Sequence, residues 1–422
     1  MKKIFISSSL ILILGFFSCK KEINTPETKQ EEVTGKPPSP PPAPSILQWK
    51  KCLGTSAEEF GTAIAKTADG YFVAGYTIDA NGNRDATVVK INLSGEVQGQ
   101  ANIGGSKSDE LFGVVPTPDG GCLVAGNTSS IDGDLSGETK GGGDVLVCKI
   151  SPSCNKEWVK TFGGSGGERA FTLINTIDGG FALAGSTTST DGDVTNSQVQ
   201  NGISIVWLVK FNITTGLPLI EWQKTFGTPD TKDDLAYALT QGAGGGYTIA
   251  ARTLTQSYNN QIWVINTNNL GTVNWENRVD SDGADVAFGI TASTDINNNI
   301  NGYVLTGYMS SVLAVVKLNL DGSVNWQKTF PAIGGQGRSV VSTPQGDIIV
   351  GRNNDLFILR LDDANGNLIS SNIFGGAKDD GGLSVITTAD GGYITAGNTS
   401  STNGDVTGNH GKSDMWVLKF KY

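Results

Sequence analysis

Three short segments place oxygen-bearing side chains on both sides of a glycine, a pattern that can wrap a cation. They are Asp132-Gly133-Asp134, Asp191-Gly192-Asp193 and Asn403-Gly404-Asp405. Carboxylate oxygens are ligands that Ca²⁺ prefers, so the candidate calcium ligands are Asp132, Asp134, Asp191, Asp193 and Asp405. None of the segments continues into the full EF-hand pattern. The alternative is that they form Asx turns that stabilise long loops.

A second set of acidic residues recurs along the chain, each just before a short run of small or apolar residues. Its members are Glu58-Glu59, Asp109-Glu110, Glu168, Asp233-Asp234, Asp285 and Asp379-Asp380. Carboxylates gathered in a ring could bind a cation, whereas each could instead fix its own turn by accepting backbone hydrogen bonds. The recurrence favours the turn-fixing role. One repeat departs from the pattern and has Gln336 and Arg338 there.

Residues for catalysis are scarce in this chain. His410 is the only histidine and lies in a polar loop, which excludes a multi-histidine metal site. We therefore predict no catalytic residues. Paired carboxylates could still serve a glycoside hydrolase or lyase, so a carbohydrate-active enzyme stays as the alternative to a binding module.

Four cysteines, Cys52, Cys122, Cys148 and Cys154, have spacings that suit neither a zinc site nor a CxxC redox motif. Cys122 and Cys148 fall on neighbouring predicted strands, and Cys154 falls on the turn that follows. Two alternatives stay open: one disulfide forms among these three cysteines, or all three are buried free thiols.

The first residues have the layout of a secretory signal: Lys2-Lys3, an apolar run over 4–17, and the small residue Ser18 before Cys19. Cys19 in this place resembles the lipobox cysteine of bacterial lipoproteins, although Phe16 stands where that family prefers leucine. The resemblance implies a signal peptide over 1–18 and a lipid on Cys19. Lys20 in place of aspartate implies the outer membrane, facing the periplasm or the cell surface. The alternatives are a conventional cleaved signal and an ordinary thiol.

Residues 19–45 are polar and proline-rich, so they cannot bury a core and are expected to form a tether. The formal net charge is −10, and the rest of the chain has no basic cluster. These features argue against nucleic acid as a partner. The expected partners are a protein or glycan ligand and, through the lipid anchor, the membrane.

One short phrase occurs seven times over the rest of the chain. The copies are YFVAGYT at Tyr71, CLVAGNT at Cys122, FALAGST at Phe181, YTIAART at Tyr247, YVLTGYM at Tyr303, DIIVGRN at Asp347 and YITAGNT at Tyr393. They are 44 to 66 positions apart, a period found in propeller blades. Asp-Gly-Gly turns precede several copies, and two further strand patterns follow each. The sequence therefore predicts an all-β, seven-bladed β-propeller of four-stranded antiparallel blades over 46–422.

The ends of the chain predict how this ring closes. The last repeat stops at its third strand, over 414–422, while the first ordered segment, over 46–54, has the pattern of a fourth strand. The N-terminal strand should therefore complete the last blade and remove an exposed edge.

The units resemble the bacterial SBBP-type β-propeller repeat, through WVLKF at Trp416, WVKTFGGSGGE at Trp158 and GGSKSDE at Gly104. The resemblance spans Ile46 to Tyr422 and implies a fold rather than a function. All eight tryptophans occupy third or fourth strands of the repeat, which favours roles in packing between blades.

The loops between second and third strands are unequal. They are long at 127–143, 186–204 and 398–413 and short at 252–261, 308–312 and 352–355. Long loops should form a wall beside a low sector, and such concave surfaces often bind ligands. The candidate ligand-binding residues of the low sector are Arg338, Arg352, Tyr258 and Tyr308. Long loops that merely tolerate insertion are the alternative.

The function that these features favour is a non-catalytic binding or scaffold module of the bacterial outer envelope, which binds a protein or glycan through one propeller face. The alternative is a carbohydrate-active enzyme. A structural role in an outer-membrane assembly, by analogy with the propeller lipoprotein BamB, is a third hypothesis that rests on fold and anchor alone.

Overall fold

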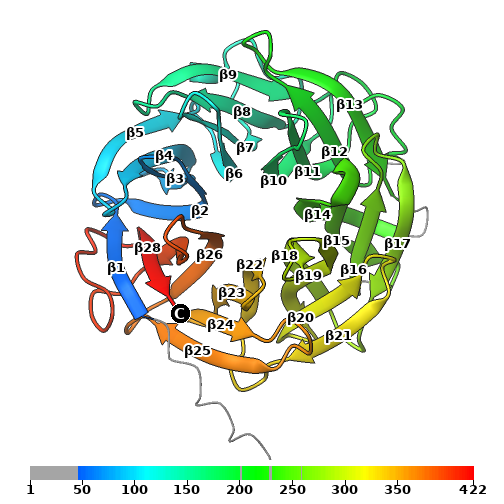
Figure 1. Ribbon diagram of the computed structural model, residues 1–422. Helices are drawn as coiled ribbons and strands as arrows, with labels where there is room; N and C mark the ends of the chain where they lie inside the picture. Colours follow the sequence, from blue (N-terminus) through cyan, green and yellow to red (C-terminus); the bar gives the residue numbers. More distant parts are fainter. Residues whose placement is uncertain (1–45, 200–201, 228–230, 258) are drawn as a thin grey trace, which may run out of the picture. The chain divides into compact units, whose positions relative to one another are not determined.

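A computed structural model describes residues 46–199, 202–227, 231–257 and 259–422. These residues form seven four-stranded antiparallel sheets arranged as blades around a central channel (Figure 1). The fold prediction is therefore confirmed. The described residues include no helix that is long and apolar enough to cross a membrane.

Each blade runs from an inner strand at the channel to an outer fourth strand. Blade 1 has β2 (Glu58–Lys66), β3 (Gly70–Ile78), β4 (Arg84–Asn92) and β5 (Val97–Ile103). Blade 2 has β6 (Asp109–Pro116), β7 (Cys122–Thr128), β8 (Asp144–Ile150) and β9 (Lys156–Phe162). Blade 3 has β10 (Glu168–Asn175), β11 (Phe181–Thr187), β12 (Ile205–Asn212) and β13 (Leu219–Phe226). Blade 4 has β14 (Thr231–Gln241), β15 (Tyr247–Thr255), β16 (Asn260–Thr267) and β17 (Val273–Val279).

The remaining blades follow the same plan. Blade 5 has β18 (Asp285–Thr294), β19 (Ile300–Met309), β20 (Val312–Asn319) and β21 (Val324–Thr329). Blade 6 has β22 (Gln336–Thr343), β23 (Gly346–Arg352), β24 (Leu356–Leu361) and β25 (Leu368–Phe374). Blade 7 has β26 (Asp380–Thr387), β27 (Tyr393–Thr399), β28 (Asp414–Lys421) and, as its fourth strand, β1 (Ile46–Leu53).

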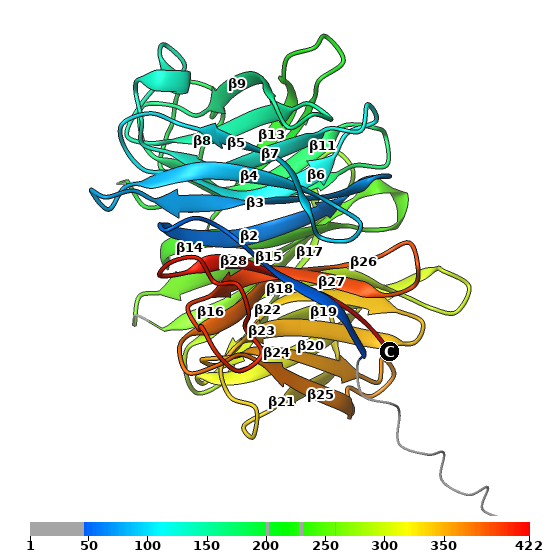
Figure 2. The ribbon, with the colours of Figure 1, turned by 90° about the vertical axis from the view of Figure 1, so that its left-hand side faces the viewer.

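The N-terminal strand closes the ring, as predicted. β1 pairs antiparallel with β28, from Ile46 opposite Lys421 to Leu53 opposite Met415 (Figure 2). Blade 7 is thus built from both ends of the described chain, and its outer edge is covered.

The middle strands of each blade are buried on both faces because neighbouring blades pack against them. All seven residues of β8 are buried, for example, whereas β9 is exposed at its first two residues. Apolar clusters accordingly join adjacent blades: one contains Phe72 of blade 1 and Leu146 of blade 2. The repeated apolar phrase is the second strand of each blade.

Tryptophan rings contribute to this blade-to-blade packing. At four interfaces, the turn between the third and fourth strands places a glycine directly on a tryptophan of the preceding blade. The pairs are Gly95 on Trp49, Gly271 on Trp222, Gly322 on Trp275 and Gly366 on Trp326. An added Cβ at Gly322 would lie 2.5 Å from Cε3 of Trp275, and its φ of 85° also favours glycine.

One interface reverses this arrangement. Gly99 of β5 lies opposite Lys90, the register position that holds tryptophan in five other blades. The facing turn of blade 2 has Cys154 instead of glycine, with a φ of 63°. The Cys154 Cβ lies 2.9 Å from where a Cβ on Gly99 would be, so the thiol occupies space that tryptophan fills elsewhere.

The four described cysteines are free thiols, so the disulfide that the sequence left possible is not seen. Cys122, Cys148 and Cys154 are buried in one apolar cluster. Burial, and then the neighbouring thiols of Cys154 and Cys148, raises the pKa of Cys122. These cysteines therefore behave as small apolar side chains.

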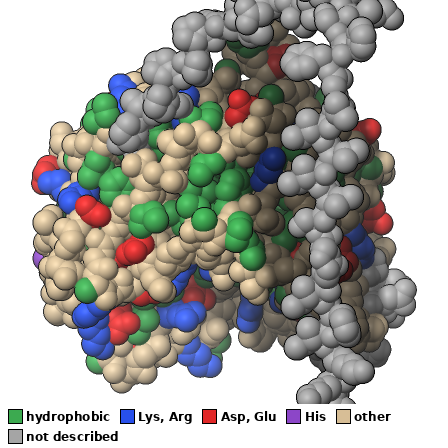
Figure 3. Space-filling model, turned by 90° about the horizontal axis from the view of Figure 1, so that it is seen from below, with side chains coloured by type: hydrophobic (Ala, Val, Ile, Leu, Met, Phe, Trp, Pro, Cys, Tyr) green, Lys and Arg blue, Asp and Glu red, His purple; other side chains and the backbone are tan. Residues whose placement is uncertain are grey.

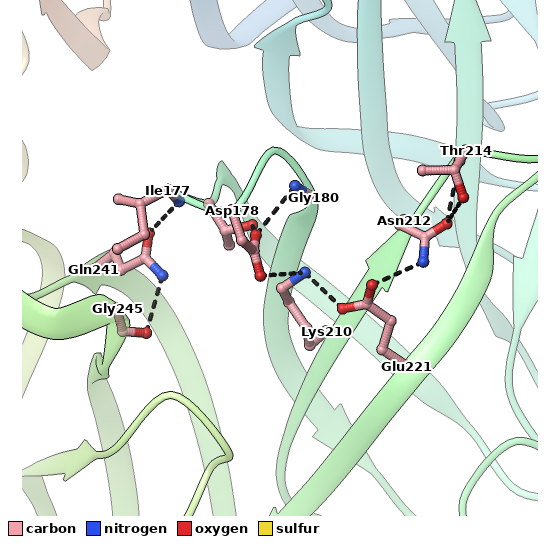
Figure 4. A network of polar contacts seen from close by, with 10 residues as sticks. Ile177, Asp178, Gly180, Lys210, Asn212, Thr214, Glu221, Gln241 and Gly245 are labelled. Atoms are coloured by element: carbon pink, nitrogen blue, oxygen red, sulfur yellow. Dashed lines mark hydrogen bonds and ion pairs between the residues drawn. The ribbon is translucent and has the colours of Figure 1, made fainter.

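A buried lysine of the third strand fastens the turn between the first two strands. In blade 3, Lys210 Nζ lies 3.2 Å from Asp178 and 2.7 Å from Glu221 (Figure 4). Lys90 with Asp69, Lys149 with Asp119 and Lys419 with Asp390 repeat the contact. Although burial opposes the shift, the hydrogen bond from Lys149 contributes to lowering the pKa of Asp119 to about 2. The lysine of the repeat is thus structural.

Candidate functional site

The two faces of the ring carry different connections. We call the face with the second-to-third-strand loops and the blade-to-blade connections the loop face, and the face with the Asp-Gly-Gly turns the turn face. Loops of blades 2, 3 and 7 are long, running between Thr128 and Asp144, Thr187 and Ile205, and Thr399 and Asp414. Those of blades 5 and 6 contain only two and three residues. The predicted inequality of the loops is present.

The Asp-Gly-Asp segments clasp the connection that enters their own blade. Asp132 accepts a hydrogen bond of 2.7 Å from the Ser106 backbone N–H, and Asp134 accepts one of 3.1 Å from Gly104. Asp191 and Asp193 bind Ser165 and Gly163 in the same way, as do Asn403 and Asp405 with Ala377 and Gly375. The central glycines have φ of 62° to 66°, and a Cβ there would meet a carbonyl oxygen within about 2.5 Å.

This clasp gives the candidate calcium ligands a structural role that the sequence did not predict. The backbone amides of the connection occupy carboxylate oxygens of Asp132, Asp134, Asp191, Asp193 and Asp405, and Lys156 also pairs with Asp134. Within the described ranges, no three His, Cys, Asp or Glu side chains are placed to hold a metal ion. Calcium binding at these residues stays a prediction. The clasp differs from simple Asx turns, because the amides belong to another segment.

The acidic residues of the inner strands fix turns, as the recurrence favoured. In five blades the buried carboxylate accepts the backbone N–H of the residue four positions earlier. The acceptors are Glu59, Asp109, Glu168, Asp285 and Asp380. These carboxylates are thus used by the fold rather than collected at the channel mouth. Blade 6 has Gly335 at the corresponding position.

A bulge in every inner strand sets the lining of the channel. The strand registers skip one residue in each blade: Thr62, Phe112, Phe171, Tyr237, Phe288, Arg338 and Leu383. A bulge bends the strand and re-aims its side chain. All seven residues line one central cavity of about 450 Å³, a size suited to a small ligand or a few side chains.

Aromatic rings form a continuous arc along one side of this cavity. The ring centroids are 5.5 Å apart for Phe112 and Phe171, 5.3 Å for Phe171 and Tyr237, and 5.1 Å for Tyr237 and Phe288. We call these four residues the aromatic arc. Each is only partly buried, so the rings offer apolar surface to an occupant.

Arg338 ends the aromatic arc with a positive charge. Its guanidinium carbon lies 4.1 Å from the centroid of the Phe288 ring, within the range of a cation–π contact. Its Nε is buried and has no hydrogen-bond partner, and Arg338 forms no ion pair with any described residue. Burial, and then the nearby Arg352, lowers the pKa of Arg338 to about 10, so the guanidinium stays charged at neutral pH.

Three other arginines around the mouth differ from Arg338 because they are paired. Arg84 pairs with Glu110, Arg252 with Asp233, and Arg352 with Asp379. Each acidic partner is the sequence neighbour of the buried acid of its inner strand. Arg338 is the arginine at a bulge of an inner strand, and it lines the central cavity without an ion pair to any described residue.

A second cavity, of about 570 Å³, lies beside the first. Gly142 and Gly143 from the long loop of blade 2 line it, and so does Ser204 from the long loop of blade 3. Phe112 and Phe171 line both cavities, so the long-loop sector and the channel share a wall.

The predicted ligand-binding residues are partly brought together. Arg338 and Arg352 line the central cavity, and the Tyr308 ring lies 5.9 Å from Phe288. Tyr258 and the lipidation candidate Cys19 lie outside the described residues. Sequence reasoning missed the aromatic arc. The signal was available, because each bulged residue of the six acidic blades follows the buried acid by three positions.

The central cavity is poorly equipped for acid–base chemistry. Its described lining contains aromatic, aliphatic, small, hydroxyl, amide and arginine side chains and no carboxylate. In the second cavity, Glu110 and Asp233 are held by arginines, and Glu168 accepts the Gly164 backbone N–H. A hydrolase that uses two carboxylates needs one of them free to move protons, whereas these three carboxylates are engaged by other groups of the chain.

Comparison with known proteins finds similarity of fold to solved structures. No protein-family model matches the sequence, and no curated protein sequence matches it either. Solved structures do match. The RRP9 WD40 repeats share 11% identity over 88% of this chain and 97% of that chain, with a TM-score of 0.50. The Cps50 (Swd1) β-propeller domain of Myceliophteria thermophila shares 10% identity over 90% and 100%, with a TM-score of 0.50.

A third match is Chaetomium thermophilum Sqt1 bound to the N-terminus of the ribosomal protein L10, with 12% identity over 82% of this chain and 83% of that chain and a TM-score of 0.48. Identities this low concern the fold alone. Taken with the strand order of the seven blades, the WD40 structures show that the chain is a seven-bladed β-propeller.

Proposed function

We propose that this protein is a non-catalytic binding module that holds a protein partner on its loop face, at the mouth of the channel. The observation that carries the proposal is the central cavity: the rings of the aromatic arc contact one another across adjacent blades but leave ring surface exposed, and Arg338 beside them is unpaired. Exposed aromatic surface next to an unsatisfied charge is costly to keep unless a ligand uses it.

We further propose that the turn face is directed toward a membrane and the loop face away from it. β1 begins at Ile46 opposite Lys421, whose Nζ lies 3.7 Å from Asp390 in an Asp-Gly-Gly turn. The chain therefore enters the propeller from the turn face. A lipid on Cys19 would therefore be joined to the propeller through a strand that begins on this face.

Exposed apolar side chains support this orientation. Twelve of the fourteen exposed large hydrophobic side chains of the described chain lie in turns of the turn face or at the first residue of a fourth strand. They are Ile46, Leu93, Val97, Ile177, Leu217, Leu219, Leu270, Val273, Ile296, Leu320, Val324 and Leu368. Figure 3 shows one side of the ring, where hydrophobic side chains are interspersed with charged ones. Such a fringe suits a shallow lipid contact better than a continuous protein interface.

A photo-cross-linking experiment in the native cell tests which face binds. A photoreactive phenylalanine analogue replaces Leu383, which lines the cavity where other blades already hold phenylalanine. The matched control places the analogue at Ile177, which is exposed on the turn face. We expect one protein adduct from position 383 that position 177 does not form. Adducts only from position 177 would contradict the proposal, and an adduct with polysaccharide would favour a glycan ligand instead.

A further inference from the structure

The inference concerns what enters the central cavity, and it rests on the proposed function. We propose that the cavity binds a carboxylate of an acidic peptide segment of the partner, with Arg338 as the group that receives the carboxylate and the aromatic arc as the surface for an adjoining apolar side chain.

The first argument is a reversal of charge that is confined to one blade. Six inner strands have a buried acid three residues before the bulge and an uncharged residue at the bulge. Blade 6 has the opposite arrangement, with Gly335 in place of the acid and Arg338 at the bulge. The acid is lost and the base gained in the same strand, so no local carboxylate is left to neutralise Arg338.

The second argument is the state of the guanidinium. One face of Arg338 lies over the Phe288 ring, which leaves the edge of the guanidinium for hydrogen bonds. Its Nε is buried and unpartnered, and the neighbouring Arg352 is already paired with Asp379. A carboxylate can bind the terminal nitrogens of a guanidinium through two parallel hydrogen bonds. A cationic ligand is disfavoured, because Arg338 already occupies the face of the ring that would attract it.

The third argument selects the class of anion. The chain has a formal net charge of −10, and Glu110, Asp233 and Asp379 around the mouth are already paired with arginines, so Arg338 is left as a single local positive charge. The overall negative charge repels polyanions such as nucleic acid or a run of uronic acids. A single carboxylate next to an apolar side chain escapes most of this repulsion and uses the aromatic arc. Peptides supply that combination through aspartate, glutamate or a chain terminus.

A nuclear magnetic resonance titration tests the proposal. It uses the full chain with isotopically labelled arginine. The signal of the Arg338 Nε–H group is assigned by its loss in Arg338→Lys. The probe is N-acetyl-phenylalanine, with N-acetyl-phenylalaninamide as the matched compound that lacks the carboxylate. We expect the acid, at millimolar concentration, to move the Arg338 signal and to bind about tenfold or more tightly than the amide.

Two further comparisons sharpen the result. Arg338→Gln should weaken the acid about tenfold or more, whereas Arg360→Gln, on a third strand away from the cavity, should leave it unchanged. Equal binding of acid and amide would overturn the carboxylate assignment, and so would an unmoved Arg338 signal. If glucuronate binds as tightly as N-acetyl-phenylalanine, the assignment of a peptide as the ligand is wrong. None of these results affects the cross-linking experiment at position 383. Failure of this inference is therefore distinguishable from failure of the proposed function.

Discussion

Asp347 provides a stability test that depends only on the core of blade 6. Its side chain is fully buried near the start of β23, and neither carboxylate oxygen has a hydrogen-bond partner among the described residues. The other six copies of the repeated phrase begin with tyrosine, phenylalanine or cysteine. Burial raises the pKa of Asp347 to about 7. The substitution Asp347→Asn keeps the shape of the side chain and removes its ionisation.

The sign and size of the effect follow from this pKa. An aspartate in the unfolded chain titrates near pH 4, so the folded and unfolded pKa values differ by about three. Between about pH 4 and about pH 7 the folded state binds more protons than the unfolded state, so the free energy of unfolding falls as the pH rises. The loss is on the order of 4 kcal/mol, and Asp347→Asn should abolish it.

Denaturant unfolding at about pH 4 and about pH 8 measures the difference between the two proteins. We expect similar midpoints at the lower pH and a clearly higher midpoint for Asp347→Asn at the higher pH. Asp282→Asn, at an exposed aspartate, is the control and should change neither. A difference between Asp347→Asn and the unaltered protein that is the same at both pH values would refute the reasoning.

Three further predictions follow from the fold and the anchor. Gly99→Trp and Cys154→Gly should each lower the free energy of unfolding, because tryptophan and the thiol occupy the same space at this interface. The double substitution should be about 1 to 3 kcal/mol more stable than the sum of the two single effects. If the two effects simply add, the thiol does not take the place of tryptophan. A chain beginning at Thr55 should melt several degrees below one beginning at Ser45, because β28 loses β1; equal melting temperatures would disprove the closure. Cys19→Ala should release the protein from the membrane fraction, since scattered apolar side chains hold it weakly, and retention after a salt wash would exclude lipidation as the anchor.

The fold could be predicted because its signals are local and repeated. Asp-Gly-Gly turns mark the hairpins, and the phrase at Tyr71 and its six relatives marks the buried second strands. The closure by β1 followed from the unmatched strand patterns at the two ends. None of these features needs knowledge of a side chain far away in the sequence.

The candidate site was harder to predict because it depends on where each inner strand bulges. Alternation of side chains suggests two faces, but it does not show that Phe112 or Phe171 is the extra residue that turns toward the channel. Arg338 was noticed because it broke the recurrence of acids. The clasp was not predicted because the sequence shows the oxygens of Asp132 and Asp191 but not the distant backbone amides that bind them.

The central claim is that the channel mouth on the loop face binds the partner, and the affinity of the cross-linked partner for Phe171→Ala tests it most directly. Phe171 lies in the middle of the aromatic arc and lines both cavities, so its removal takes away contact surface. We predict a loss of affinity of about tenfold or more, with circular dichroism unchanged and with Ile177→Ala, on the turn face, binding normally. An unchanged affinity of Phe171→Ala for that partner would contradict the account.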